Sequence, residues 1–326
     1  MAGFFGLFDY TKEGPGIDKD DLPKSDSAIF LSVLGRRFWK FISLNLMYVL
    51  FSIPIIIFSY FLSSFLLAFL FPTLNINDLS EKLLINTAGL DEDFAYQLAG
   101  RTIFLIQVIF TAFNMSFLYH VIGPVQAGFT YIFRNYARDE HAFLWMDFKD
   151  AFVKNFRQSI VCSIISILLN FLFVFSLAFY RNQFNNYWLR TIVTVILIIV
   201  FFYFSSMNMY LYQMMVTFNL SIKHLYKNAS LFTILRLPFN ILLILANLLI
   251  FVGVPAFLFM VVPSIDLLFL ITVFWYVCFA FSLNYFIQNF YVNKQIKKYM
   301  LSRLEESQPT DDRLNLENNG SDDGLS

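Results

Sequence analysis

The stretch Gly123–Ser159 reads GPVQAGFTYIFRNYARDEHAFLWMDFKDAFVKNFRQS and lies between two long apolar runs. It holds most of the charge in the middle of the chain, and its apolar and charged residues are sorted onto opposite helical faces. Pro124 cannot donate a backbone hydrogen bond to the carbonyl of His120, and Gly123 adds flexibility, so the stretch opens with a helix break. We predict that an amphipathic segment follows this break and lies on the cytoplasmic surface of a membrane.

The composition of the whole chain is that of a membrane protein. Of its 326 residues, 58% are hydrophobic and only 14% are charged, whereas soluble domains contain about 25% charged residues. Apolar runs of about 18 residues or more with few charges are typical of transmembrane helices. We therefore predict an all-α polytopic membrane protein with six transmembrane helices and cytoplasmic amphipathic surface helices. The predicted spans are Phe41–Phe71, Thr102–Ile122, Ile160–Phe179, Thr191–Phe218, Ile241–Val262 and Leu267–Val292.

The chain divides into a membrane domain and two flanking segments. Residues 41–292 are predicted to form the six-span domain, with a kink at Pro54 and a long loop at 72–100. Residues 1–40 are predicted to be a cytoplasmic lead-in that ends in a short interfacial helix; the alternative is that its basic end is only a positive flank of the first span. Residues 293–326 are a basic and then acidic tail whose composition predicts disorder.

The distribution of Lys and Arg predicts the orientation of the spans. With both termini in the cytoplasm, 19 of the 23 Lys and Arg residues lie on the cytoplasmic side, as the positive-inside rule requires. The formal net charge is zero, which predicts no nucleic-acid partner. We expect a multi-pass protein of the plasma membrane whose partner, on composition alone, is the lipid bilayer.

The central stretch supplies a candidate hinge at Gly123 and Pro124. A break inside a helix allows bending, so these two residues are candidates for a moving joint or for a pore-lining break. The alternative is that they mark the point where a span ends and a surface helix begins.

The second half of the stretch supplies a candidate docking face. Its apolar residues recur every four positions and predict a helix; they are Leu144, Phe148, Phe152 and Phe156. Its charged residues lie on another face and are candidates for contact with a cytoplasmic partner; they are Asp147, Asp150, Lys154 and Arg157. The apolar stripe is expected to contact either lipid or the undersides of neighbouring spans.

Every predicted span contains side-chain amides rather than charges. The candidates are Asn45, Asn114, Asn170, Asn208, Asn247 and Asn284. They are expected to join helices by hydrogen bonds; the alternative is that they line a polar path for a small solute. Coupled transporters usually need an acid or a base deep in a span, and no predicted span contains one.

The sequence predicts no catalytic, cofactor-binding or metal-binding residue. Asp139, Glu140 and His141 are consecutive, whereas metal ligands on a helix converge at spacings of three or four residues. Sequence motifs of nucleotide-binding loops, hydrolases and zinc sites are absent from the chain. We do not expect an enzyme.

Four segments have sequences typical of one family: GPGIDKDDLPK, RRFWKFISLNLMYVLFSIP, the central stretch quoted above, and LYKNASLFTILRLPFN. In these segments the chain resembles the YesL family of bacterial integral membrane proteins. The resemblance implies a protein of a Gram-positive bacterium, in a family often encoded beside carbohydrate ABC importers and sugar-responsive sensors. It implies no site residues.

The function expected is that of an accessory protein, with permease or sensor kinase subunits as partners. A transporter or channel for a small polar solute is the alternative.

Overall fold

The computed structural model describes residues 25–87, 89–118, 122–262 and 264–301, and all of its regular structure within these ranges is helical. Six helical segments are long and apolar enough to cross a membrane. They are Phe38–Leu70, Glu92–Leu118, Phe156–Tyr180, Tyr187–Thr217, Leu237–Val261 and Asp266–Met300. The prediction of an all-α polytopic protein with six spans is confirmed.

The first two spans are α2 (Phe38–Leu70) and α4 (Glu92–Leu118), and Pro54 lies inside α2 as expected. The prediction of a loop at 72–100 is wrong, because α3 (Ile76–Asn86) and the start of α4 occupy most of it. Asn75 caps α3 by accepting a hydrogen bond from the backbone nitrogen of Asp78 at 2.9 Å. Such a cap satisfies a backbone donor that the short helix leaves free.

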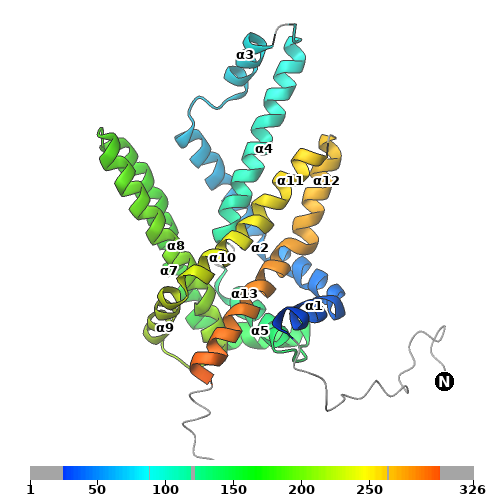
Figure 1. Cartoon of the computed structure of the whole chain (residues 1–326), viewed down its shortest axis with the longest axis vertical. Coiled ribbons are helices and arrows are strands. Elements are labelled where there is room, and N and C mark those ends of the chain that lie inside the picture. The colour runs from blue at the N-terminus through cyan, green and yellow to red at the C-terminus, as the bar shows by residue number, and fades with distance from the viewer. Residues whose placement is uncertain (1–24, 88, 119–121, 263, 302–326) are drawn as a thin grey trace, which may run out of the picture.

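The remaining spans form two hairpins. The first consists of α7 (Phe156–Gln183) and α8 (Tyr187–Thr217). The first arm of the second hairpin leads away from the end where α1 lies, through α10 (Leu237–Leu248), η3 (Leu249–Gly253) and α11 (Val254–Val261). The second arm returns through α12 (Ile265–Trp275), η4 (Tyr276–Ala280), α13 (Phe281–Ile296) and η5 (Lys297–Leu301). Figure 1 shows the α7–α8 hairpin leaning away from α4, α11 and α12 at the end distant from α1.

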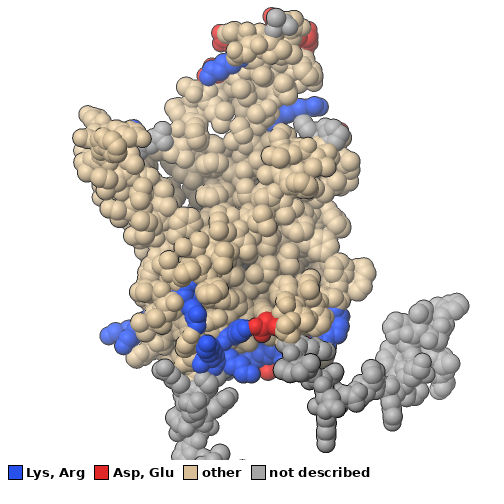
Figure 2. Space-filling view, in the orientation of Figure 1, with Lys and Arg blue, Asp and Glu red and all other residues tan. Residues whose placement is uncertain are grey.

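Four shorter helices gather at the opposite end, which we call the basal end (Figure 1). They are α1 (Asp26–Arg36), α5 (Gly123–Ala137), α6 (Leu144–Lys154) and α9 (Ile222–Leu235). Figure 2 shows Lys and Arg concentrated there, below a broad band with little charge. The basal end therefore has the charge expected of the side that faces water next to a membrane surface.

Helix α5 is a central packing element, which corrects the prediction of a surface segment. Twelve of its 15 residues are buried. Phe129 and Phe133 belong to an apolar cluster with α2 and α13, and Ala127 belongs to a second cluster with α8 and α9. Because both sides of α5 are covered by other helices, its amphipathic pattern does not indicate a solvent-exposed face.

Two of the three π-helices in the described ranges, η3 and η4, face each other across the last hairpin. Trp275 donates its indole hydrogen to the carbonyl of Ile250 at 3.0 Å, and the hydroxyl of Tyr276 donates to the carbonyl of Phe251. A π-turn interrupts the regular helical ladder, and buried backbone groups need partners. The side chains of one hairpin arm therefore satisfy carbonyls of the other.

The boundaries of the flanking segments also differ from the prediction. Asn293 and Ile296 are buried in α13, and helical structure extends to Leu301, so residues 293–301 are not a disordered tail. Lys294 pairs with Asp26, which ties α13 to the start of α1. Residues 1–24 and 302–326, which contain most of the lead-in and the acidic part of the tail, lie outside the described residues.

Candidate functional site: the basal cleft

A cleft of about 260 Å³ opens at the basal end between α5, α6 and the segment that follows α8. Its lining consists of Tyr131, Asp147, Asp150, Ala151, Lys154, Asn155, Met215, Val216, Thr217, Phe218 and Asn219. Three of the four residues of the predicted docking face are therefore brought together around one depression. The fourth, Arg157, belongs to α7, is exposed, and does not line the cleft.

Helix α6 forms one wall of the cleft. Asp147 accepts a hydrogen bond from the backbone nitrogen of Phe143 at 2.8 Å, which closes the first turn where a negative charge is favourable. Phe148 is buried on α5, with its ring centroid 5.0 Å from that of Phe129. The apolar stripe thus packs on the bundle, while Trp145 and Val153 are 61% and 62% exposed.

Arg134 does not line the cleft but holds its opposite wall, which Val216 and Thr217 form. Its guanidinium donates to the carbonyl of Val216 at 2.6 Å and to the hydroxyl of Thr217 at 3.5 Å, and it lies 4.5 Å from the centroid of the Tyr131 ring. A cation at the carboxyl end of a helix is favourable because the last carbonyls have no helical partner. Burial lowers the pKa of Arg134, and the nearby Arg138 lowers it further.

Sequence analysis counted Arg134 as a cytoplasmic charge and missed this capping role. Its partners lie more than 80 positions away in the chain, so no local pattern pointed to them.

The charged groups at the mouth of the cleft are open to a partner. Asp150 and Lys154 are four residues apart on α6, but no ion pair joins them to each other or to another described residue. Both are exposed. The cleft therefore presents an unpaired carboxylate and an unpaired ammonium on one wall, beside the amides of Asn155 and Asn219.

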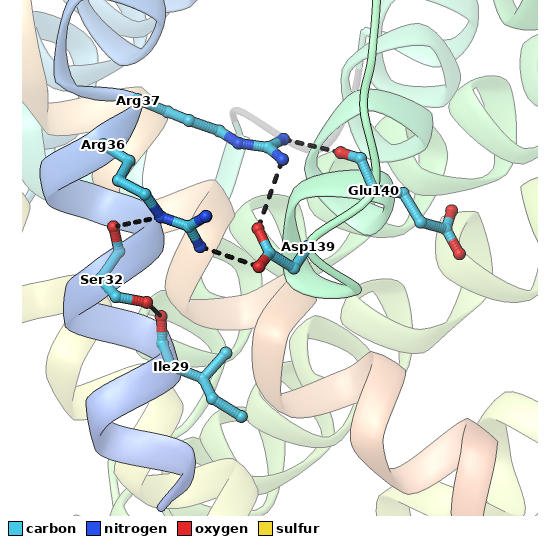
Figure 3. Close-up of polar contacts among 6 residues, drawn as sticks. All are labelled: Ile29, Ser32, Arg36, Arg37, Asp139 and Glu140. Carbon is cyan, nitrogen blue, oxygen red and sulfur yellow. Dashed lines mark hydrogen bonds and ion pairs between the residues drawn. The ribbon is translucent and has the colours of Figure 1, made fainter. Parts of the chain in front are cut away.

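A cluster of charged side chains holds the α5–α6 turn against α1 (Figure 3). Arg36 and Arg37 donate to the carboxylate of Asp139 at 2.8 and 3.4 Å, and Arg37 also donates to the carbonyl of Glu140 at 2.7 Å. The Arg37 guanidinium also lies 4.4 Å from the centroid of the Tyr136 ring, and burial raises the pKa of Tyr136 to about 12.

Asp139 is therefore a structural partner of the arginines rather than part of a cluster with His141. Within the ranges that the structure describes, no group of three or more His, Cys, Asp or Glu side chains could hold a metal.

Gly123 and Pro124 lie where α5 begins, after the end of α4 at Leu118. Gly123 has a φ of +41°, and a Cβ built on it would lie 3.1 Å from the carbonyl oxygen of Ser159 on α7. The glycine is required both by its backbone conformation and by this close approach. The two residues thus mark a change of helix, and the hinge stays a prediction.

The predicted span amides lie in separate helix contacts. Asn45 donates to the carbonyls of Tyr276 and Val277 at 2.7 Å each and accepts from the nitrogen of Ser282 at 2.8 Å. It therefore fixes π-helix η4 to α2.

The other amides pair elsewhere: Asn114 with Ser63, Asn208 with Ser166, Asn247 with the carbonyl of Ser116, Asn170 with its own helix, and Asn284 with Gln288. None of the six predicted amides lines the basal cleft.

No family model, curated protein or solved structure matches this chain. Its function therefore has to be inferred from its residues and their geometry.

Proposed function

We propose that the protein is an accessory subunit of a membrane assembly and that its basal cleft receives a segment of a cytoplasmic or membrane partner. The observation that carries the proposal is the unpaired Asp150 and Lys154 at the mouth of a polar cleft whose walls are fixed by buried contacts. Fixed walls and unpaired surface charges are suited to recognition, because complementary charge guides a partner into one register.

The partner proposed is a permease subunit of a carbohydrate ABC importer or a sugar-responsive sensor kinase. The support is the resemblance to the YesL family, to which we assign the chain as part of the proposal.

The basal end is proposed to face the cytoplasm of a Gram-positive bacterium, with the spans in the plasma membrane. The excess of Lys and Arg at the basal end supports this orientation. A single cysteine introduced at Asn86 or Asn185 is expected to react with an impermeant maleimide in intact cells, whereas one at Asp139 or Lys227 reacts only after permeabilisation. The native Cys162 and Cys278 are replaced by Ser in every variant, and reversed labelling would overturn the orientation.

Affinity purification in mild detergent tests the accessory role. The tagged full-length chain is expected to retain a permease or sensor subunit, and deletion of its gene is expected to reduce uptake of the corresponding sugar. If neither subunit is retained and uptake is unchanged, the accessory role is wrong.

A second function, movement of a small polar solute, is favoured by one observation. Gln213 is 1% exposed, and neither polar atom of its side chain has a hydrogen-bond partner among the described residues. A buried amide without a partner is costly, so a polar solute or water is expected to satisfy it. Flux of labelled sugars into proteoliposomes that contain only this protein would favour the second function, particularly if Gln213→Leu abolishes it.

A further inference from the structure

A second depression, of about 280 Å³, lies in the membrane-spanning half distant from the basal end, between α4 and α12. Leu268 and Thr272 form its floor and are 4% and 9% exposed. Phe104 and Phe269 also line it, are 47% and 55% exposed, and pack against each other with their ring centroids 6.4 Å apart. The depression is therefore an apolar groove that opens toward the bilayer.

Gly100 keeps one end of the groove open. A Cβ built on this residue would meet no atom within 4 Å. Helix packing does not require a glycine here, because no neighbouring helix approaches the backbone of α4 at this point. A side chain at this position would instead occupy the groove itself.

Arg101 lies at the same end and supplies the only charge of the lining. It is the last charged residue of α4 before the run 102–118, which contains none, so it marks the boundary between the bilayer core and water. The side chain is exposed and makes no hydrogen bond or ion pair with any residue in the described part of the chain. The groove thus combines an apolar trough with one unpaired cation at its polar end.

We propose that this groove binds an anionic glycerophospholipid, with one acyl chain in the trough and the phosphate on Arg101. A guanidinium binds phosphate oxygens through two parallel hydrogen bonds, and burial of an acyl chain removes its methylene groups from contact with water. The charge of Arg101 lies at the membrane boundary, and the apolar lining extends from it toward the bilayer core. This arrangement matches a lipid in the leaflet distant from the basal end, with its headgroup at the boundary and its acyl chain in the core.

Native mass spectrometry of the full-length protein, released from nanodiscs that contain equal amounts of phosphatidylglycerol and phosphatidylcholine, tests the site. The wild type is expected to retain one phosphatidylglycerol in preference to phosphatidylcholine. Arg101→Gln is expected to reduce this preference about tenfold, because the quaternary ammonium of phosphatidylcholine offsets its phosphate, so that only phosphatidylglycerol has a net attraction to the guanidinium. Arg190→Gln is the matched control: Arg190 also lies near the distant end of a span, but it does not line the groove.

Gly100→Phe separates the chain site from the headgroup site. It fills the groove, leaves Arg101 in place, and is expected to abolish retention of either lipid while the protein stays monodisperse. The proposal is wrong if the wild type shows no headgroup preference, or if both Arg101→Gln and Gly100→Phe retain phosphatidylglycerol as the wild type does. A photoreactive residue at Phe269 that crosslinks to a protein rather than to a lipid would also overturn it.

Discussion

Asn45→Leu is expected to destabilise the protein by about 2 kcal/mol or more. The change keeps the size of the side chain but removes its hydrogen bonds to Tyr276, Val277 and Ser282. Interhelical hydrogen bonds in membranes contribute about 0.6 kcal/mol on average, and the backbone groups of a buried π-helix left without a partner add a further penalty. Asn45 is fully buried, so water does not replace it.

Thermal unfolding in mild detergent, followed by tryptophan fluorescence, measures this effect. Asn170→Leu is the matched control, because Asn170 donates only to the carbonyl of Ser166 in its own helix. That carbonyl keeps its regular helical hydrogen bond after the substitution. A lower melting temperature for Asn45→Leu alone is expected; equal shifts for the two variants would contradict the role of Asn45 at η4.

Gly128→Val is expected to have the second large effect, because it separates α6 from α5. A Cβ at Gly128 would lie 2.5 Å from Cδ2 of Phe148 and 3.0 Å from the carbonyl oxygen of the same residue. The ring of Phe148 is held between Phe51 and Phe129, so it cannot simply turn away. Overpacking of a well-packed core costs about 1–3 kcal/mol, and here it also displaces one wall of the basal cleft.

The same thermal measurement with Gly35→Val provides the control. Gly35 lies on α1, and a Cβ there would meet no atom within 4 Å. Valine has a slightly higher helix propensity than glycine, so no loss of stability is expected. If Gly128→Val melts at the wild-type temperature, the close contact between α5 and α6 is not present in the protein.

The spans were predictable from the sequence because a membrane requires long apolar helices, and few other segments satisfy that pattern. The position of α5 was not predictable in the same way. Its polar residues suggested a solvent-exposed face. In the structure, however, Arg134 caps α8, and Gln126 accepts a hydrogen bond from the hydroxyl of Tyr285. Both partners come from distant parts of the chain, so a local amphipathic pattern could not distinguish a solvated face from an internally paired one.

Neither the composition nor the periodicity of the sequence predicts the π-helices η3 and η4. They depend on Asn45, which is separated by 231 positions from Tyr276, and on contacts between the arms of the last hairpin. The amide of Asn45 was identified as a helix-packing candidate, but its target was not. By contrast, the proximity of Asp147, Asp150 and Lys154 was predictable, because they lie within three turns of one helix and their spacing alone places them close together.

The most direct test of the accessory role compares the amount of partner that co-purifies with variants of the cleft. The double variant Asp150→Lys with Lys154→Glu reverses both unpaired charges. Lys149→Glu, also exposed on α6 but outside the lining, is the control. Quantitative mass spectrometry of the affinity-purified complexes is expected to show a loss of about tenfold or more of the permease or sensor subunit for the double variant, since misplaced like charges cost several kcal/mol at an interface. Lys149→Glu is expected to retain the wild-type amount. Equal retention by all three proteins would contradict docking at the basal cleft.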